Sequence, residues 1–298
     1  MFIYLNDKIV KKEDAMISPF DHGFLYGMGL FETFRIYDGH PFLLDDHLER
    51  LNHGLEVLNI RHQFHREETN RILQILLEKN KLSNAYIRLN ISAGTGDIGL
   101  QTASYKEPNI IIFSKPLPPA GELTEKKAIL LKQKRNTPEG DERLKSHHFL
   151  NNMLAKREIG DSPELEGIFL SENGFLAEGI VSNLFWKKGN FLYTPALSTG
   201  ILNGITRQFV MELAKKHSLS VQEGHYTLEQ AIEAEEMFVT NSIQEIVPLS
   251  SFDRHVLPGK TGVWVQRFHQ DYSLFCKSLW SRRNLGVKKH ERKNNQGN

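Results

Sequence analysis

Short stretches of alternating apolar and polar residues mark the first part of the chain as a set of strands. Such alternation is typical of a strand with one buried face. Asn6-Asp7 and Asp38-Gly39 are turn sequences that would join neighbouring strands into hairpins. The predicted strands in this part span residues 2–5, 8–10, 30–37, 41–44, 85–92 and 110–114.

Helical spacing appears between these strands. Leucines recur every three or four residues from Leu48 to Leu58, which predicts a helix with one apolar face. Asp45-Asp46 directly before them could cap that helix. A second helix is predicted over residues 72–79. The first part of the chain therefore reads as α+β.

The clearest break in the pattern is the proline-rich stretch at residues 115–121. Three prolines and a glycine cannot continue a strand ladder or a helix, so we place an interdomain linker there. The predicted domains are a small N-terminal domain (1–115), a linker (116–124), a larger C-terminal domain (125–282) and a disordered basic tail (283–298). The larger domain is predicted to hold strands at 128–134, 166–171, 184–186, 191–193 and 235–240, and helices at 149–159 and 203–217.

Composition narrows the class of protein. The net charge of +1 offers no overall field that would attract nucleic acid or acidic membranes. Cys276 is the only cysteine, which rules out an internal disulfide and fits a reducing compartment. The N-terminus turns polar too early for a signal peptide, and no apolar run approaches the roughly 20 residues of a membrane span. A cytoplasmic protein without nucleic-acid or membrane partners is expected.

The start of the helix after residue 203 is a candidate anion site. Its first amides have no partner within the helix and point outward with the positive end of the helix dipole. Gly204 would let the backbone approach a phosphate, and Thr206, Ser242 and Arg50 could add two hydroxyls and a forked cation. An ordinary capped helix beside a solvated arginine is the alternative.

Lys145 and Glu178 are candidate functional residues, each with its own role. A lysine whose amine loses its charge through burial can attack an aldehyde, and a carboxylate can keep a pyridine nitrogen protonated. Surface charges at both positions are the alternative. His147 and His148 are adjacent, so they lack the spacing by which one helix face holds a metal. The glycines near residue 27 do not follow the dinucleotide-binding fingerprint.

In this order, these residues resemble the class IV (fold type IV) pyridoxal-phosphate aminotransferase family. The resemblance implies an α+β fold with a small N-terminal α/β sandwich domain and a larger domain with a barrel-like sheet. It also implies pyridoxal 5′-phosphate as cofactor, and a homodimer whose substrate pocket lies between the domains and is completed by the neighbouring subunit. The most specific segments are Glu178-Gly179, Ser182-Asn183-Leu184-Phe185, Tyr193-Thr194-Pro195 and Gly204-Ile205-Thr206-Arg207.

The resemblance also assigns roles at the cofactor site. Lys145 would be the Schiff-base lysine, Glu178 would pair with the pyridine nitrogen, and Leu202 would pack against the ring. The other cofactor-binding residues that it implies are Arg50, Asn183, Ile205, Thr206, Asn241 and Ser242.

Three activities compete within this family. Tyr86-Ile87-Arg88 is similar to branched-chain aminotransferases, and the spacing from Lys145-Ser146 to Asn151-Asn152 is similar to D-amino-acid aminotransferases. Residues 17–34, 183–190 and 203–209 look most like the lyases that release pyruvate from 4-amino-4-deoxychorismate and leave 4-aminobenzoate, a step of folate biosynthesis. This lyase activity is the expectation.

The substrate site is less well marked by sequence. Thr33 would donate a proton to the leaving oxygen, and Tyr26, Arg35 and Arg88 would bind substrate. Some lyases carry an arginine in the loop after the Arg88 strand, but residues 93–99 contain no basic side chain. A packed strand threonine and structural or surface arginines are the alternatives. A non-catalytic cofactor-binding protein, or a nucleic-acid protein using the basic tail, are alternatives of other classes.

Overall fold

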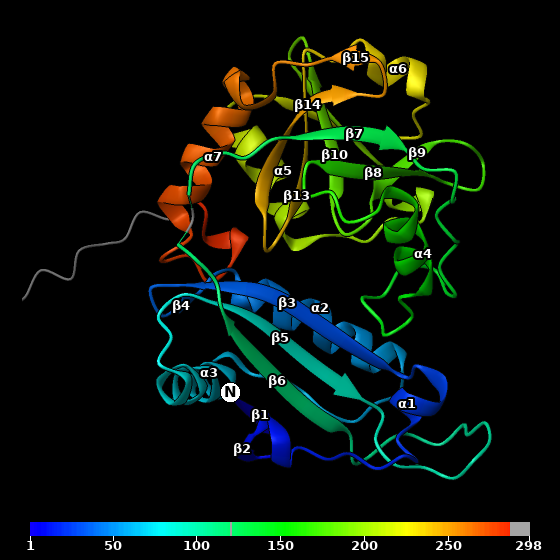
Figure 1. The fold of residues 1–298 in the computed structure, drawn as a ribbon, viewed down its shortest axis with the longest axis vertical. Helices are drawn as coiled ribbons and strands as arrows, with labels where there is room; N and C mark the ends of the chain where they lie inside the picture. Colours follow the sequence, from blue (N-terminus) through cyan, green and yellow to red (C-terminus); the bar gives the residue numbers. More distant parts are fainter. Residues whose placement is uncertain (120, 287–298) are drawn as a thin grey trace, which may run out of the picture.

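The computed structural model describes residues 1–119 and 121–286, and it places the strands in two separate sheets (Figure 1). The first sheet is antiparallel throughout, in the order β2-β1-β6-β5-β3-β4. Its strands are β1 (Phe2–Leu5), β2 (Lys8–Lys11), β3 (Gly29–Tyr37), β4 (His40–Pro41), β5 (Ala85–Ser92) and β6 (Asn109–Pro116).

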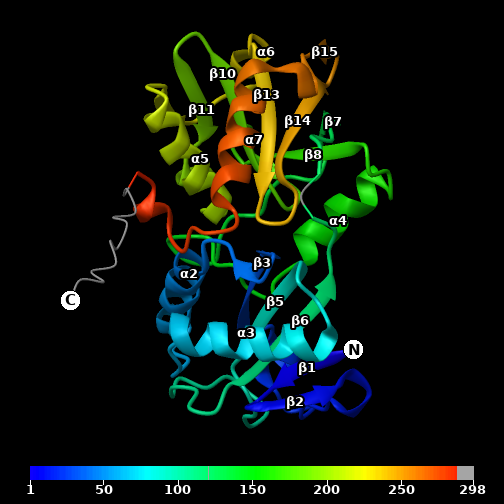
Figure 2. The ribbon, with the colours of Figure 1, turned by 90° about the vertical axis from the view of Figure 1, so that its left-hand side faces the viewer.

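Two helices, α2 (Leu44–Val57) and α3 (Arg66–Asn80), cover one face of this sheet (Figure 2). Strict alternation along β5 buries its odd-numbered residues, from Ala85 to Ile91, against them. The even-numbered residues stand on the opposite face, which looks toward the second half of the molecule. A short helix, α1 (His22–Tyr26), precedes β3.

The second sheet closes on itself. Its strands pair in the cycle β10-β13-β14-β7-β8-β9, and β9 pairs back to β10 through Glu178 and Asn183. These strands are β7 (Lys126–Leu130), β8 (Leu165–Leu170), β9 (Leu176–Gly179), β10 (Asn183–Lys188), β13 (Glu236–Asn241) and β14 (Glu245–Phe252). Three further strands extend it: β11 (Phe191–Pro195), β12 (Ser220–Gly224) and β15 (His255–Val256).

Helices surround this barrel-like sheet. The apolar faces of α5 (Ile205–Lys216) and α7 (Val263–Phe275) share one buried cluster with β10 and β13. The remaining helical elements are α4 (Leu150–Ile159), α6 (Leu228–Ile232) and the 3-10 turns η1 (Lys12–Asp14), η2 (Leu197–Thr199), η3 (Gly259–Thr261) and η4 (Arg282–Asn284). The predicted fold class, an α/β sandwich domain plus a larger domain with a barrel-like sheet, is confirmed.

The structure corrects several boundaries. The predicted strand at 41–44 is wrong, because β4 ends at Pro41 and α2 begins at Leu44. Asp45-Asp46 does not cap α2: Leu43 occupies the cap position, and the Asp46 carboxylate accepts a hydrogen bond from the Arg282 amide at 2.8 Å. A tertiary partner has taken the side chain that local spacing would have assigned to the cap.

Other element ends also moved by a few residues. The strand predicted to reach residue 134 ends at Leu130, and α5 begins at Ile205 rather than 203. The domain limits stay a prediction. Of the tail predicted over 283–298, residues 283–284 belong to η4, whereas residues 287–298 lie outside the described part of the chain.

Candidate active site

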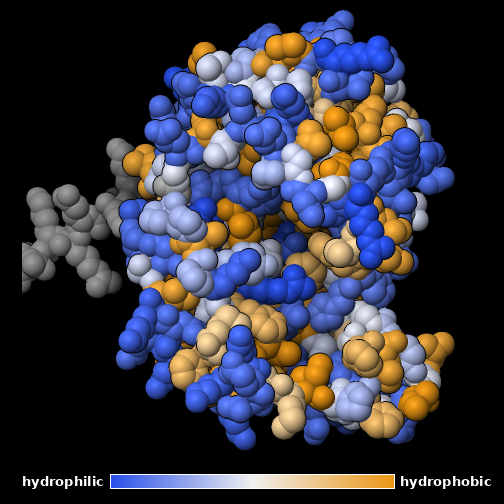
Figure 3. All heavy atoms as spheres, in the orientation of Figure 1, coloured by the Kyte–Doolittle hydropathy of each residue, from blue (hydrophilic) through white to orange (hydrophobic). Residues whose placement is uncertain are grey.

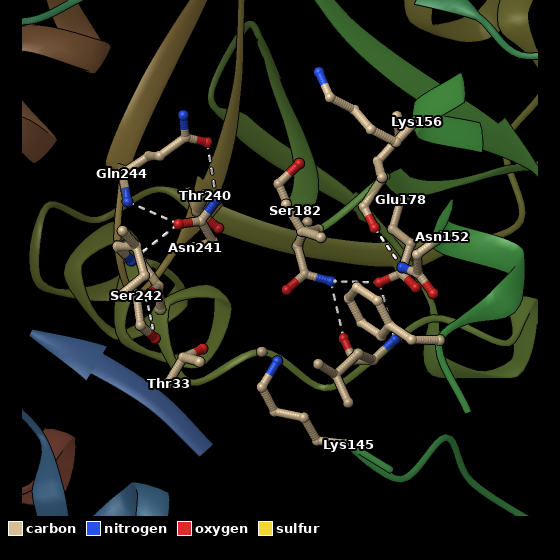
Figure 4. A pocket seen from close by; sticks show the side chains of 18 of the residues that line it. Thr33, Lys145, Asn152, Lys156, Glu178, Ser182, Thr240, Asn241, Ser242 and Gln244 are labelled. Atoms are coloured by element: carbon tan, nitrogen blue, oxygen red, sulfur yellow. Dashed lines mark hydrogen bonds between the residues drawn. The ribbon is translucent and has the colours of Figure 1, made fainter. Parts of the chain in front are cut away.

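A cavity of about 640 Å³ lies where the open face of the first sheet meets the barrel. One wall comes from β3 and β5, which contribute Phe31, Thr33 and Arg88, and the opposite wall comes from β9, β13 and the start of α5. Figure 3 shows the surface hollowed between the two halves of the molecule, and Figure 4 shows side chains from both walls converging there.

Lys145 enters this cavity from an extended segment that bridges the first sheet and the segment before α5. Its carbonyl oxygen accepts a hydrogen bond from the Phe31 amide at 2.9 Å, and residues 143 and 146 form bridges to Leu202 and Leu30. Its ammonium nitrogen lies 4.6 Å from the centre of the Phe31 ring. Burial first, and then the Arg50 charge, lower the pKa of Lys145 to about 8. A fraction of this amine is therefore uncharged near neutral pH.

The Glu178 carboxylate defines one end of the cavity. It is buried on β9, and Oε2 accepts hydrogen bonds from the Leu202 amide at 3.0 Å and from Asn183 Nδ2 at 3.3 Å. The other oxygen, Oε1, accepts from Arg135 Nε at 2.8 Å. Asn183 also donates to the Leu202 carbonyl at 2.8 Å. These contacts fix the position of Glu178 and bring Leu202 to the wall of the cavity.

Arg135 was missed by the sequence analysis. Its Nη1 donates to Asn151 Oδ1 at 2.7 Å, so Arg135 ties Glu178 to α4. Arg143 lies 4.0 Å from the same carboxylate; burial, followed by the charge of Arg135, lowers the pKa of Arg143 to about 10. Two arginines therefore lie beside one buried carboxylate.

The other end of the cavity is built around the start of α5. Gly204 occupies the cap position without a side-chain cap, so within the described residues the first amides of α5 have no capping partner. Thr206 Oγ1 lies 3.3 Å from Ser242 Oγ across this end. Thr240, which also lines the cavity, has a buried hydroxyl with no hydrogen-bond partner among the described residues.

Arg50 reaches this end through an ion pair that the sequence did not predict. Its Nε and Nη2 each bind one oxygen of Glu32 at 2.7 Å, and Nη1 donates to the Asn203 carbonyl at 2.9 Å. The forked contact expected for a phosphate is thus occupied by Glu32. His47 Nδ1 completes the cluster at 2.7 Å from Glu32 Oε2.

Two residues of this end have roles that differ from the sequence reasoning. A Cβ on Gly204 would come within 2.0 Å of Asn183 Oδ1, so the glycine makes room for Asn183 and not only for an anion. Asn241 Oδ1 accepts from the amides of Ile243 and Gln244 at 2.9 and 2.7 Å. Asn241 therefore shapes the turn that presents Ser242.

The predicted substrate residues separate into two groups. Thr33 and Arg88 line the cavity on paired positions of β3 and β5, and the guanidinium carbon of Arg88 lies 3.8 Å from the centre of the Phe31 ring. Arg35 is absent from the lining: it pairs with Glu245 at 3.2 Å and donates to the backbone carbonyls of Pro118 and Ile243.

Tyr26 does not line the cavity of its own chain either. Its hydroxyl accepts a hydrogen bond from the Gly99 amide at 2.8 Å, beyond the end of β5. No group of three or more potential metal ligands occurs in the described part of the chain. Among the described helices, none has the length and apolar character needed to cross a bilayer.

Comparison with known proteins defines the class to which this fold and site belong. The family described as amino-transferase class IV matches residues 29–252, so the chain belongs to that family. It is an enzyme of the pyridoxal-phosphate-dependent type.

Individual relatives narrow the comparison. The chain is 50% identical to an aminodeoxychorismate lyase of Bacillus subtilis. The 253 aligned residues cover 84% of this chain and 86% of the relative. It is 38% identical to a putative branched-chain-amino-acid aminotransferase of Methanocaldococcus jannaschii, over 87% of this chain and 91% of the relative.

Solved structures show the same fold. The branched-chain aminotransferase of Escherichia coli superimposes with a TM-score of 0.81 at 28% identity, over 93% of this chain and 95% of that one. A putative 4-amino-4-deoxychorismate lyase of Legionella pneumophila gives 0.79 at 26% identity, over 88% and 96%.

The residues present fit pyridoxal phosphate. The buried Thr240 hydroxyl and the first amides of α5, which have no partners among the residues that the structure describes, need an acceptor, which a phosphate supplies. A buried carboxylate on Glu178 suits a protonated ring nitrogen, and the amine of Lys145 suits an aldehyde.

Proposed function

We propose that the protein is an aminodeoxychorismate lyase, which converts 4-amino-4-deoxychorismate into pyruvate and 4-aminobenzoate. The observation that carries this choice is the 50% identity to the Bacillus subtilis lyase across most of both chains. The geometry supports the chemistry, because an amine, a hydroxyl and an arginine from different elements line one cavity.

The cofactor supplies an aldehyde that bonds to amines and a pyridine ring that accepts electrons. Glu178 would hold the ring nitrogen protonated, while Arg135, Asn183 and the Leu202 amide hold Glu178 in place. Ser242, Thr206 and the first amides of α5 would hold the phosphate. Lys145 would supply the amine that bonds to the aldehyde in the resting enzyme.

Lys145 would also act as the base. Its free amine would take the proton from the substrate carbon that carries the substrate amine. A pKa near 8 suits this role, because the amine can both accept and return a proton near neutral pH.

Thr33 would assist the bond that breaks. The carbon–oxygen bond to the enolpyruvyl group is cleaved, and the Thr33 hydroxyl donates a proton to the leaving oxygen. The proton taken by Lys145 would replace the one that Thr33 gives up, and the released enol would tautomerise to pyruvate. The two products, 4-aminobenzoate and pyruvate, then account for every atom of the substrate. Arg88, on the position of β5 that pairs with Thr33, would bind a substrate carboxylate.

Transamination is the second candidate, supported by the similarity to the Methanocaldococcus jannaschii protein. It would use the same base and the same cofactor contacts, but after proton removal Lys145 would return the proton to another carbon, and no carbon–oxygen bond would break. Pyruvate release from 4-amino-4-deoxychorismate, measured with lactate dehydrogenase, should be rapid, whereas turnover of L-leucine or D-alanine with 2-oxoglutarate should be slow. The reverse ranking would overturn the lyase assignment. Lys145→Ala should be inactive in both assays.

A homodimer is part of the same proposal. Apolar side chains stand exposed on α1, on the loop after β5 and on α4: Phe24 is 73% exposed, Leu100 97% and Leu150 71%. A second copy could cover these surfaces and add residues to the cavity. Light scattering should give twice the chain mass, and Leu150→Asp should lower it. The cytoplasmic location and the role in folate biosynthesis stay predictions.

A further inference from the structure

A line of polar contacts runs from the interior of the first sheet to the proposed phosphate site. Glu32 Oε2 lies 2.7 Å from His47 Nδ1, and His47 Nε2 lies 3.5 Å from Ser242 Oγ. Ser242 in turn lies 3.3 Å from Thr206 Oγ1 at the start of α5. Glu32 and His47 are each 1% exposed, so water does not compete for their contacts.

The ionisation state of Glu32 determines which atoms along this line carry a hydrogen. Burial alone would raise its pKa, but the charges of Arg50 and His47 lower it to about 2, so the carboxylate can only accept hydrogen bonds at neutral pH. Nδ1 of His47 must therefore carry a hydrogen. If His47 is neutral, Nε2 has none and accepts the hydroxyl hydrogen of Ser242. The Ser242 oxygen then offers only lone pairs to its other neighbours.

An anion at this site needs the opposite arrangement. If Ser242 donates its hydrogen to a phosphate oxygen, it keeps its hydrogen bond to His47 only when Nε2 also carries a hydrogen and donates to Ser242 Oγ. The nearby charges also favour a protonated His47. The positive charge of Arg50 is cancelled by Glu32 in their forked pair, so Arg50 leaves little net charge to stabilise a phosphate.

The surroundings of His47 contain few other charges. Glu32 faces it from β3, and Arg50 and Asp46 lie on its own helix, where Asp46 is paired with Arg282. The Phe34 ring packs 5.2 Å from the imidazole, and the turn after β13 contributes the neutral Ser242. A dianion at Ser242 would therefore be the largest change in the field at His47.

We propose that His47 is a positioning residue that takes up one proton from solution when the cofactor phosphate binds, and so turns the Ser242 hydroxyl toward that phosphate. Before binding, burial lowers the pKa of His47 and keeps it neutral. After binding, the phosphate stabilises the imidazolium. This inference requires that the protein binds pyridoxal phosphate, but it does not require the lyase activity. The inference and the lyase assignment can therefore fail independently.

The sign of the resulting pH dependence follows from linkage. Binding raises the pKa of His47, so the added affinity is complete below the pKa of the free protein and is lost as pH rises toward the pKa of the complex. One linked proton changes the dissociation constant by at most about tenfold per pH unit. The phosphate group itself is a dianion above about pH 6, so it does not titrate between pH 7 and 8.5.

The test uses pyridoxine 5′-phosphate, which lacks an aldehyde and cannot bond to Lys145. Its dissociation constant from the cofactor-free protein should rise several-fold between pH 7 and 8.5 in the wild type. In His47→Gln the dissociation constant should rise less over the same pH interval, because glutamine cannot take up the proton that His47 binds. Titration of Lys145 contributes equally to the wild type and to the variant. His53→Gln, on the exposed side of the same helix, should behave as wild type.

Two further measurements keep the inference testable if His47→Gln does not fold. Ser242→Ala removes the link and should also flatten the pH dependence. In protein labelled with ¹⁵N-histidine, the Nε2 signal of His47 should change from the unprotonated to the protonated position when pyridoxine 5′-phosphate binds, and should not change with pyridoxine. Equal pH slopes in wild type and both variants, or an unchanged Nε2 signal, would overturn the inference.

Discussion

Glu32 and Glu178 are two buried carboxylates near opposite ends of one cavity, and each meets an arginine: Glu178 lines the cavity, whereas Glu32 lies behind Arg50. Glu32 gives both of its oxygens to Arg50 and is also bound by the His47 imidazole, so both oxygens are occupied by donors. Glu178 gives only Oε1 to Arg135 and keeps Oε2 among an amide side chain and a backbone amide.

This difference separates two uses of a buried charge. The Glu32 carboxylate has no oxygen left for a ligand, so it acts on the cavity only through Arg50 and His47. The Oε2 atom of Glu178 accepts hydrogen bonds only from neutral donors, so a protonated ring nitrogen could add a charged donor to it. One end of the cavity therefore holds its carboxylate for structure, and the other holds it for chemistry.

Removing Arg135 should have the largest effect on stability. Arg135→Ala would leave Glu178 buried without its hydrogen-bonded cation, with only Arg143 at 4.0 Å, and breaking a buried pair in this way costs about 3–5 kcal/mol. Urea unfolding of the cofactor-free protein would measure the loss. Arg157→Ala, on the exposed side of α4, should stay within about 0.5 kcal/mol of wild type. Similar values for both variants would show that the pair is not a structural requirement.

Glu32→Gln should reveal the structural carboxylate through pH. The pKa of Glu32 is lowered, so its stabilisation is present above the ordinary value of 4.5 and is lost as pH falls toward about 2. That interval corresponds to about 3 kcal/mol. The wild type should be more stable than the variant at pH 7, and the difference should shrink below pH 4.5. A difference that did not change with pH would contradict this account.

Glu178→Gln should affect chemistry more than cofactor retention. The amide keeps the shape but cannot stabilise a charged ring nitrogen, and loss of one such electrostatic contact lowers turnover on the order of 10²-fold. The phosphate end is untouched, so the variant should still bind the cofactor and show its absorbance. Lost cofactor with normal turnover per bound cofactor would reverse the roles given to the two ends.

The smallest expected effect is a shift in the pH profile of Lys145. Its neutral amine attacks the aldehyde, so the rate of imine formation with pyridoxal should rise with pH up to about 8 and flatten above it. Arg50→Gln removes the second cause of the lowered pKa, after burial, and should move the profile to higher pH by less than about one unit. An unmoved profile would mean that burial alone sets this pKa.

The sequence predicted the elements of the site better than its contacts. Strand β5 and the start of α5 were predictable because alternation and helix chemistry are local. Arg135 was missed because it meets Glu178 across 43 positions of sequence, and no local rule brings them together. Glu32 carried a usable signal, since a charged residue within the apolar run of β3 needs a buried partner. Arg35 carried the same signal and proved to be bound to Glu245.

The segment around Lys145 has one more consequence. Its backbone is joined to the segment before α5 through the bridge of Arg143 to Leu202 and to the first sheet through the bridge of Ser146 to Leu30. The main chain at this point therefore cannot shift without disturbing both halves of the molecule. During a reaction cycle the nitrogen must travel by rotation about the bonds of its own flexible methylene chain. The distance over which it can carry a proton is set by that side chain alone.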